Sequence, residues 1–305
     1  MEALHQGVDG NMEAQPQKGY LLLADISGYT AFMANTELAH APLVLNQIIR
    51  FLTKELTPTM QLAEVEGDAL FLYASENDIS RGELLLELVE SCYINFRDKR
   101  RTMAHNITCP CNACQTVTTL DLKFIVHYGE YVLQKMTGKL KPFGSSVNLA
   151  HRLLKNSVKE TTGWNGYVLF SNICLNKMEL SPENIYKGME KYDHFGEVET
   201  ISINFEEKYQ EYSANRKDFI KPEDADVNLE YTFTAPPPII WDWLNDPTKR
   251  NKWYAGNKSN WVVKDRPHGR TGSSANNHCT NSGFIEHILD WRPFHYFTVR
   301  HKKDG

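Results

Sequence analysis

The chain carries the sequence LLADISGYT at residues 22–30, in which a short apolar run meets a carboxylate and then a glycine loop. The apolar run extends back to Gly19, and the stretch Gly19–Asp25 is typical of a buried strand. Asp25 therefore ends a predicted strand, and the loop after it leads into a helix. Because Gly28 permits close approach to the backbone N–H groups, this loop suits a triphosphate. Taken singly, an aspartate before a glycine loop is more often a turn or N-cap residue.

A second carboxylate lies at the turn of a predicted hairpin. Two strand-like runs, Leu62–Val65 and Ala69–Tyr73, flank the turn sequence Glu66-Gly67-Asp68. Asp68 is then at the hairpin tip, on a strand end next to that of Asp25. Two carboxylates on adjacent strand ends can hold two Mg²⁺ ions, with water and phosphate completing the coordination.

The remaining periodicity predicts helices and strands in irregular alternation. Amphipathic spacing predicts the helices, and short apolar or alternating runs predict the strands. The expected helices are Leu43–Leu56, Arg81–Phe96 and Ser145–Leu154, and the expected strands are Leu120–Tyr128, Tyr167–Phe170 and Phe195–Phe205. This order favours an α+β fold in which helices cover one side of a sheet.

Composition divides the chain into four regions. Residues 1–18 lack periodicity and are expected to form a disordered tail, whereas residues 19–214 hold the pattern above. The polar stretch 215–228 is predicted to be a linker, and residues 229–305 form a further region rich in Trp. At about 150 residues per domain, a chain of 305 residues would form about two domains.

Overall composition excludes several classes of protein. With 41% hydrophobic and 23% charged residues, the chain is an ordinary globular protein rather than a fibrous or disordered one. No apolar stretch approaches the ~20 residues of a membrane helix, and the N-terminus does not predict a secretory signal. A net charge of -5 argues against a nucleic-acid partner. With six Cys and no signal, we expect a cytoplasmic protein with free thiols or a metal site.

Four motifs, in order, resemble those of class III nucleotidyl cyclases, the catalytic domains of adenylate and guanylate cyclases. They are residues 22–30 for the first strand, 64–69 for the hairpin, 124–130 for the fourth strand and 143–153 for the transition-state helix. Each motif alone is weakly specific, whereas the four motifs in this order form a specific signal. The resemblance covers residues 19–212 and implies a ferredoxin-like, cyclase-type α+β fold with an antiparallel sheet.

The resemblance also implies a set of site residues. Asp25 and Asp68 match the aspartates that bind two Mg or Mn ions. Asn148 and Arg152 match the residues that orient the ribose and stabilise the reacting phosphate, and four residues apart on a helix they share a face. The implied substrate-binding residues are Ile26, Ser27, Gly28, Tyr29, Thr30, Glu64 and Lys141.

The reaction implied by the resemblance converts a nucleoside triphosphate to a 3′,5′-cyclic nucleotide and pyrophosphate. In this family the site lies at a homodimer interface. The metal-binding aspartates come from one chain, and the base-reading and transition-state residues come from the other.

The positions that read the nucleobase depart from the family pattern. Glu64 stands where guanylate cyclases have Glu and adenylate cyclases have Lys, whereas Lys141 matches neither group. The pair could accept from and donate to guanine, uracil or adenine, so the nucleobase stays open. Alternatively, Glu64 and Lys141 form an exposed ion pair that reads nothing.

A late-strand lysine that binds the triphosphate in many cyclases also has no clear match, unless Lys191 serves. This favours a second hypothesis, a catalytically weak cyclase-like module that binds nucleotide or dimerises. His127, within the fourth-strand motif, is expected to be a core or interface histidine rather than a catalytic base.

A cysteine cluster predicts a further site. Cys109, Cys111 and Cys114 lie within six residues, close enough for their thiolates to converge on Zn²⁺, with His105 as the nearest fourth ligand. Alternatively these are reduced loop thiols, some of them packed as small apolar groups.

The C-terminal region carries a different resemblance. Residues 231–247 resemble the opening of START-like domains, the polyketide cyclase/dehydrase and lipid-transport group, and residues 284–294 fit a following strand. The resemblance implies a helix-grip α+β fold whose cavity could take an apolar small molecule; alternatively, the aromatic residues are ordinary core. Residues 301–305 predict a hairpin turn, so residues 229–305 are expected to be a truncated START-like domain.

Overall fold

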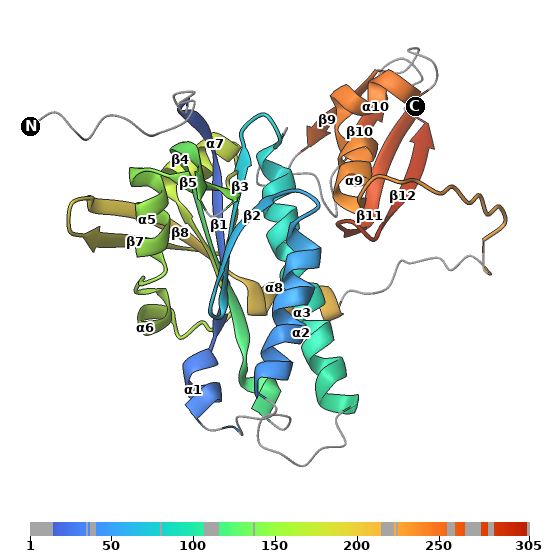
Figure 1. Ribbon diagram of the computed structural model, residues 1–305. Coiled ribbons are helices and arrows are strands. Elements are labelled where there is room, and N and C mark those ends of the chain that lie inside the picture. Colours follow the sequence, from blue (N-terminus) through green and yellow to red (C-terminus); the bar gives the residue numbers. More distant parts are fainter. Residues whose placement is uncertain are drawn as a thin grey trace, which may run out of the picture.

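The computed structural model describes two sheets with attached helices (Figure 1). It describes residues 15–34, 36, 41–79, 81–106, 116–136, 138–214, 223, 225–254, 260–265, 276–279 and 284–303. The strands of the first sheet are β1 (Gln17–Ser27), β2 (Gln61–Glu66), β3 (Ala69–Ser75), β4 (Asp121–Met136), β5 (Lys139–Phe143), β6 (Tyr167–Ser171), β7 (Ile185–Tyr192) and β8 (Gly196–Asn204). The helices of this region are α1 (Tyr29–Ala34), α2 (Ala41–Leu56), α3 (Gly82–Asn106), α5 (Ser145–Leu153), α6 (Val158–Thr162), α7 (Asn172–Met178) and α8 (Phe205–Ala214).

The first sheet has the ferredoxin-like arrangement. Its strand order is β2-β3-β1-β4-β6-β8-β7, with β5 paired to β4. The elements β1, α2, β2, β3, α3 and β4 follow the βαββαβ order of that fold. Neighbouring strands are antiparallel except β4 and β6, which are parallel. The expected α+β fold class is therefore confirmed.

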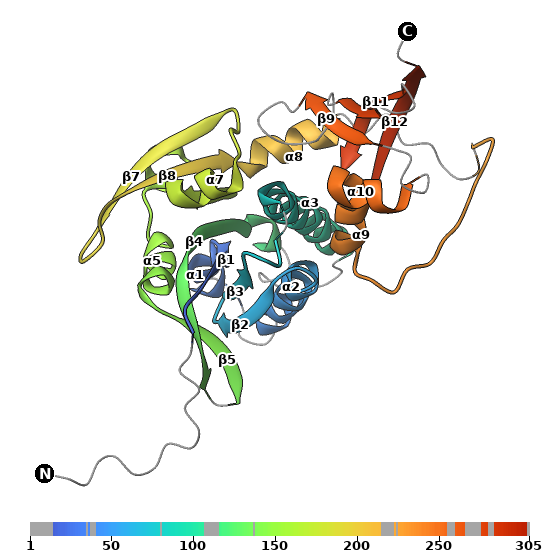
Figure 2. The same cartoon turned by 90° about the horizontal axis from the view of Figure 1, so that it is seen from above.

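Helices cover both faces of this sheet, so the expectation that they cover one side is wrong. Alternate residues of β1 point to opposite faces. Leu22 and Ala24 belong to the apolar core shared with α2 and α3, whereas Leu21 and Leu23 belong to the core under α5. Figure 2 shows α5 on one side of the sheet and α2 and α3 on the other. A continuous apolar run is what a strand buried on both faces requires.

Elements with a clear apolar period lie where the sequence predicts them, whereas the more polar elements differ from the prediction. The hairpin of β2 and β3 is confirmed, as are the expected helices and strands in their main extent. The expected tail ends too late, because Gln17 and Lys18 pair with Tyr131 and Glu130 of β4. The sequence also misses β5 and β7, since β5 contains a proline and the one buried residue of β7 is Glu190, which leaves no apolar periodicity.

The second sheet belongs to the C-terminal unit, residues 237–303. It comprises α9 (Pro237–Asn245), α10 (Pro247–Trp253) and the strands β9 (Trp261–Asp265), β10 (Asn276–Cys279), β11 (Phe284–Arg292) and β12 (Tyr296–Lys303), paired in sequence order. The expected strand at 284–294 is confirmed as β11. The expected turn at 301–305 is wrong for His301–Lys303, which pair with β11 as part of β12.

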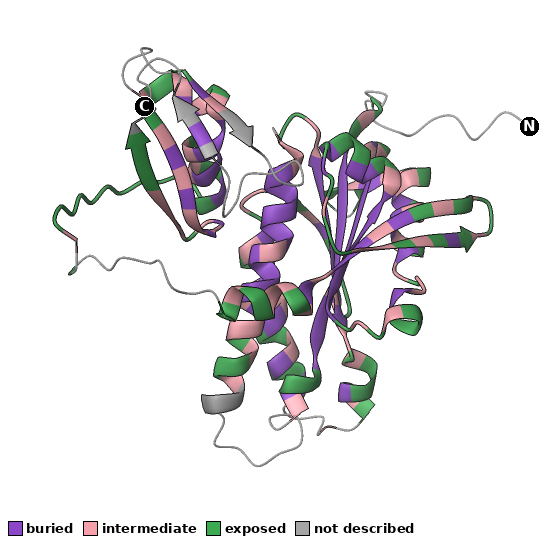
Figure 3. Cartoon of the chain, turned by 180° about the vertical axis from the view of Figure 1, so that it is seen from behind, coloured by how far each residue is buried: buried purple, intermediate pink, exposed green. Residues whose placement is uncertain are grey.

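The C-terminal unit has its own small aromatic core and lies against α3. Trp241, Ile288 and Trp291 form the buried centre of that core. Figures 1 and 3 show α9 and β11 beside α3, whose other side faces the buried first sheet. Among the described residues, no helix is long and apolar enough to cross a membrane.

Candidate functional site

The first sheet brings two aspartates and a lysine together at the ends of three neighbouring strands. Asp25 of β1 lies opposite Ala69 of β3 and opposite Lys123 of β4. Asp68 immediately precedes β3, in the turn where Gly67 takes a positive φ of 66°. The backbone N–H of Ile26 donates to the carbonyl of Asp68 at 3.4 Å, which ties the turn to the end of β1. We call Asp25, Asp68 and Lys123 the carboxylate edge.

The charges of the carboxylate edge are only partly compensated. Burial raises the pKa of Asp68, and the negative charge of Asp25 raises it further. Lys123 Nζ lies 3.1 Å from Asp25 Oδ2, and its charge lowers the pKa of Asp68 by less. One ammonium group beside two carboxylates leaves a net negative charge, which a further cation would offset. Oxygen donors of this kind fit Mg²⁺ or Mn²⁺, so the residues present fit the implied metals.

Lys123 is a candidate site residue that the sequence motifs do not single out. It lies one position before the fourth-strand motif, and its Nζ donates to Leu154 O at 3.3 Å as well as contacting Asp25. The available signal was weak, because the expected strand Leu120–Tyr128 carries two charged residues, Asp121 and Lys123, and its sequence does not say which of them faces the site. Its closeness to Asp25 follows from the pairing register of β1 and β4, which the sequence does not state.

The loop after Asp25 turns directly into α1. Ile26 is buried, Ser27 and Tyr29 are half-buried, and Gly28 and Thr30 are exposed. Gly28 has a φ of 86°, and its carbonyl accepts from the Phe32 N–H at 2.9 Å, which starts the helix. The positive φ explains the glycine, because other residues rarely adopt it. The expected helix after the loop is confirmed.

The two predicted base-reading residues contact each other. Lys141 Nζ lies 2.7 Å from Glu64 Oε2. Lys141 comes from β5, which pairs with the long strand β4, and Glu64 comes from a bulged part of β2. The Glu64 side chain is 44% exposed, so solvent can reach this ion pair. The contact agrees with the simple ion-pair alternative, and it also presents a donor beside an acceptor.

Helix α5 presents Asn148 and Arg152 away from the core. Val147, Ala150 and Leu153 are buried against the sheet, whereas Asn148 and Arg152 are exposed. Neither of the two side chains forms a hydrogen bond or ion pair with any residue that the structure describes. Within one chain, no such contact joins them to Asp25 or Asp68 in the described ranges.

The buried histidine and two cysteines behave as core residues. His127 is 3% exposed, its Nδ1 lies 2.7 Å from Ser171 Oγ, and burial lowers its pKa to about 4. It is therefore neutral near pH 7, which confirms the expectation of a core histidine. Burial raises the pKa of the Cys92 and Cys174 thiols, so neither is a ready thiolate.

The predicted zinc site lies outside the described residues. This applies to Cys109, Cys111 and Cys114, and to the side chain of His105 at the end of α3. Within the described part of the chain, no group of three or more His, Cys, Asp or Glu could hold a metal ion.

The chain shows two similarities at the level of sequence. Residues 21–162 match the model of a family described as "Protein of unknown function (DUF2652)". An uncharacterized protein of Mycobacterium tuberculosis is 34% identical over 99 residues, which cover 32% of this chain and 46% of that protein. The chain thus spans about half the length of this curated relative.

Solved structures of nucleotidyl cyclases resemble this fold. A bacterial light-regulated adenylyl cyclase is 12% identical with a TM-score of 0.48, covering 64% of this chain and 54% of that one. The adenylyl cyclase CyaB from P. aeruginosa is 17% identical with a TM-score of 0.44, covering 62% and 94%. The guanylate cyclase domain of RhGC from Catenaria anguillulae, in complex with GTP, is 13% identical with a TM-score of 0.44, covering 62% and 97%. TM-scores below 0.5 do not establish a shared activity.

Proposed function

We propose that the chain is a nucleotidyl cyclase, which converts a nucleoside triphosphate to a 3′,5′-cyclic nucleotide and pyrophosphate. The observation that carries this proposal is the carboxylate edge, where two aspartates lie close enough for one to raise the pKa of the other. Lys123 offsets only one of the two negative charges, so a divalent cation would stabilise the pair, and a triphosphate would be a ligand of that cation.

Each residue of the site has a chemical role in this reaction. The ribose 3′-hydroxyl gives up its proton to water and its oxygen bonds to the α-phosphorus, the bond from that phosphorus to the oxygen that bridges to the β-phosphate breaks, and pyrophosphate leaves. Asp25 and Asp68 would hold Mg²⁺ or Mn²⁺, which lowers the pKa of the 3′-hydroxyl and offsets phosphate charge. Lys123 is placed to exchange its contact with Asp25 for one with a phosphate oxygen. Arg152 would stabilise charge on the reacting phosphate, and Asn148 would orient the ribose.

A second copy of the chain would complete the site. Asn148 and Arg152 are exposed, and neither has a polar partner in the described residues. In a homodimer with two-fold symmetry, α5 of each chain can face the carboxylate edge of the other chain. Two composite sites result.

Glu64 and Lys141 would then contact the nucleobase. Lys141 can donate to a ring nitrogen or carbonyl, and the free oxygen of Glu64 can accept from an adjacent N–H. Guanine, uracil and adenine each offer such an acceptor beside a donor. The pair therefore supports base contact without selecting one base.

The test is to incubate the purified chain with each of the four nucleoside triphosphates and Mn²⁺ or Mg²⁺. Mass spectrometry should detect a cyclic product from at least one of them. Asp68→Asn and Arg152→Ala should each lower the rate at least ~100-fold, whereas Glu160→Gln on the exposed side of α6 should not. The absence of product from every triphosphate would refute the enzyme proposal.

A non-catalytic module that binds nucleotide is the second candidate. Its support is that Lys123 already neutralises Asp25, and that Lys191, the one candidate for a late-strand lysine, is exposed on β7. This candidate predicts triphosphate binding in the same experiment, without turnover.

The C-terminal unit supports a separate proposal of an apolar ligand. A cavity of about 470 Å³ is lined mainly by apolar side chains, among them Phe233, Ile240, Trp241 and Phe297. Its size suits a small molecule. A START-like identity for this unit remains part of that proposal.

A further inference from the structure

Helix α3 carries a row of polar side chains that is buried. Glu83, Glu87, Ser91 and Asn95 recur every four residues and so lie on one side of the helix. The first three are at most 4% exposed, although such a row would ordinarily face solvent. We call these four residues the polar face of α3. The opposite face, which includes Val89, packs in the core of the first sheet.

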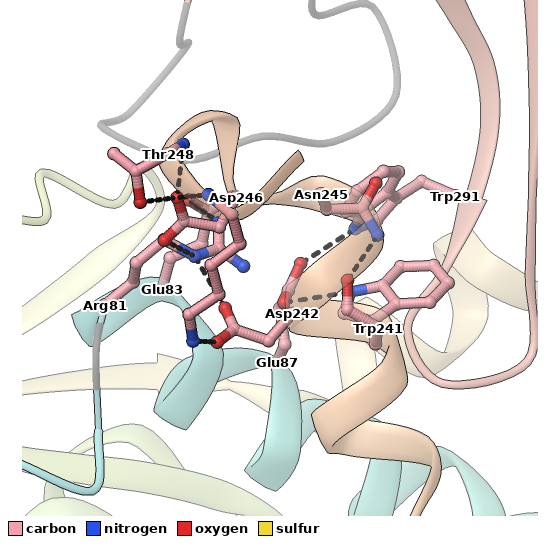
Figure 4. Close-up of polar contacts among 10 residues, drawn as sticks. Arg81, Glu83, Glu87, Trp241, Asp242, Asn245, Asp246, Thr248 and Trp291 are labelled. Atoms are coloured by element: carbon pink, nitrogen blue, oxygen red, sulfur yellow. Dashed lines mark hydrogen bonds and ion pairs between the residues drawn. The ribbon is translucent and has the colours of Figure 1, made fainter. Parts of the chain in front are cut away.

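The C-terminal unit covers this polar face, with Glu87 at the centre. Trp241 Nε1 donates to Glu87 Oε2 at 3.2 Å, and Trp291 Nε1 donates to Glu87 Oε1 at 3.0 Å (Figure 4). Glu87 has no exposed surface. The two indole rings pack against each other in the core of the C-terminal unit, with centroids 4.7 Å apart. Their N–H groups both point to Glu87 of α3.

Ionic and hydrogen-bonded contacts continue toward the start of α3. Arg81 bonds to Glu83 Oε2 at 2.9 Å and to Asp242 Oδ1 of α9 at 3.0 Å. It also lies 3.6 Å from Asp246 Oδ2. Figure 4 shows Arg81 between carboxylates from both units. Burial lowers the pKa of Arg81, but the negative charges of Glu83, Glu87 and Asp242 raise it by more, so the guanidinium stays charged.

The contacts continue along α3 in the other direction. The Ser91 hydroxyl donates to Pro293 O at 3.4 Å. Arg292 Nη2 donates to Asn95 Oδ1 at 2.9 Å, and Asn95 Nδ2 lies 3.2 Å from His295 Nε2. Every member of the polar face therefore has a polar partner in the C-terminal unit or in Arg81, which itself bonds to that unit.

The interface between α3 and the C-terminal unit, called here the junction, is polar enough for the two sides to separate. Apart from Phe294, which packs on both cores, the contacts named here are polar. Polar interfaces between domains resemble transient interfaces, because water can replace the lost hydrogen bonds. Apart from this shared Phe294, each unit has its own apolar core.

We propose that the polar face of α3 is a reversible docking surface for the C-terminal unit, with Glu87 as its anchor. In the docked state the unit braces α3. The core under α3 includes β1 and β3, whose ends form the carboxylate edge. Undocking therefore loosens the carboxylate edge and weakens triphosphate binding, a consequence that rests on the proposed function.

Hydrogen–deuterium exchange on the full chain tests the docking directly. Two variants weaken the anchor: Glu87→Gln removes the charge, and Trp291→Phe keeps an aromatic ring but removes one N–H. Both should raise amide exchange along residues 82–96 by about tenfold or more, the effect of losing one hydrogen bond to a charged group. The control Glu160→Gln, at an exposed site on α6, should match the wild type.

The proposal is overturned if both variants fold, as judged by circular dichroism, and retain wild-type exchange. If Glu87→Gln fails to fold, Trp291→Phe decides. Triphosphate affinity, measured on the same samples with Mn²⁺, separates the two proposals. A wild type that binds no triphosphate refutes the proposed function and leaves the exchange result standing. Increased exchange with unchanged affinity refutes the link between docking and the carboxylate edge.

Discussion

The carboxylate edge and the polar face of α3 both contain acidic side chains, but they differ in how far the negative charge is compensated by neighbouring groups. Glu87 is fully buried and receives an indole N–H on each oxygen. Asp68 is only half-buried, and neighbouring Asp25 makes its ionisation less favourable. Buried carboxylates whose oxygens are hydrogen-bonded stabilise a structure, whereas two carboxylates that repel each other near solvent are suited to bind a ligand. This difference separates a structural role from a site.

The largest expected effect on stability is at Arg81, which bonds to Glu83 of the polar face of α3. Arg81→Ala should lower the free energy of unfolding by about 3 kcal/mol or more, because it removes the positive charge beside buried Glu83 and leaves buried Asp242 with Lys249 as its remaining ion-pair partner. Urea denaturation measures this loss. The control is Arg50→Ala on the exposed side of α2, which should change stability by less than about 0.5 kcal/mol. Equal effects of the two variants would contradict the assignment.

The next largest effect is expected from divalent cations, which should stabilise the chain through the carboxylate edge and not through the polar face of α3. At about 100 times its Kd, Mn²⁺ should stabilise the wild type by about 2.7 kcal/mol, since it binds only the folded carboxylate edge. Thermal unfolding with and without Mn²⁺ measures the gain. The gain should be lost in Asp68→Asn and kept in the control Glu160→Gln, at an exposed site on α6. A gain that persists in Asp68→Asn would place the cation elsewhere.

Without divalent cations, Asp68→Asn should stabilise the chain at pH 7. The pKa of Asp68 is raised in the folded state, so its contribution to stability is present at low pH and lost as pH rises through the folded pKa. The advantage of Asn should therefore be absent below about pH 4 and develop toward neutrality. Because solvent screens this half-buried group, we expect at most about 1 kcal/mol. A pH-independent difference in urea denaturation would argue against charge strain.

The smallest effect on stability is expected at the exposed ion pair. Glu64→Gln should cost at most about 0.5 kcal/mol, because Glu64 and Lys141 are partly solvated. It should nevertheless change the ratio of rates among the four triphosphates if the pair contacts the base. Unaltered ratios would leave the pair as a simple surface contact.

Local patterns in the sequence predict much of the first sheet and the carboxylate pair. Asp25 and Asp68 stand next to strong strand and turn signals, so their neighbourhood follows from short-range periodicity. The role of Lys123 depends on the register of β4 against β1, which one motif cannot specify. Glu87 lies in a helix whose second face looks solvent-exposed until the C-terminal unit is placed. Such long-range contacts are set by tertiary packing rather than by local pattern.

The central claim is a cyclase site shared between two copies of the chain, and mixing inactive variants tests it most directly. Asp68→Asn and Arg152→Ala should each be inactive alone. Equimolar mixing with subunit exchange makes half of the dimers mixed, each with one intact site, so about a quarter of wild-type cyclic product formation should return. Size-exclusion chromatography confirms that the mixture is dimeric. A dimeric, subunit-exchanged mixture that stays inactive while the wild type makes cyclic product would contradict the shared site.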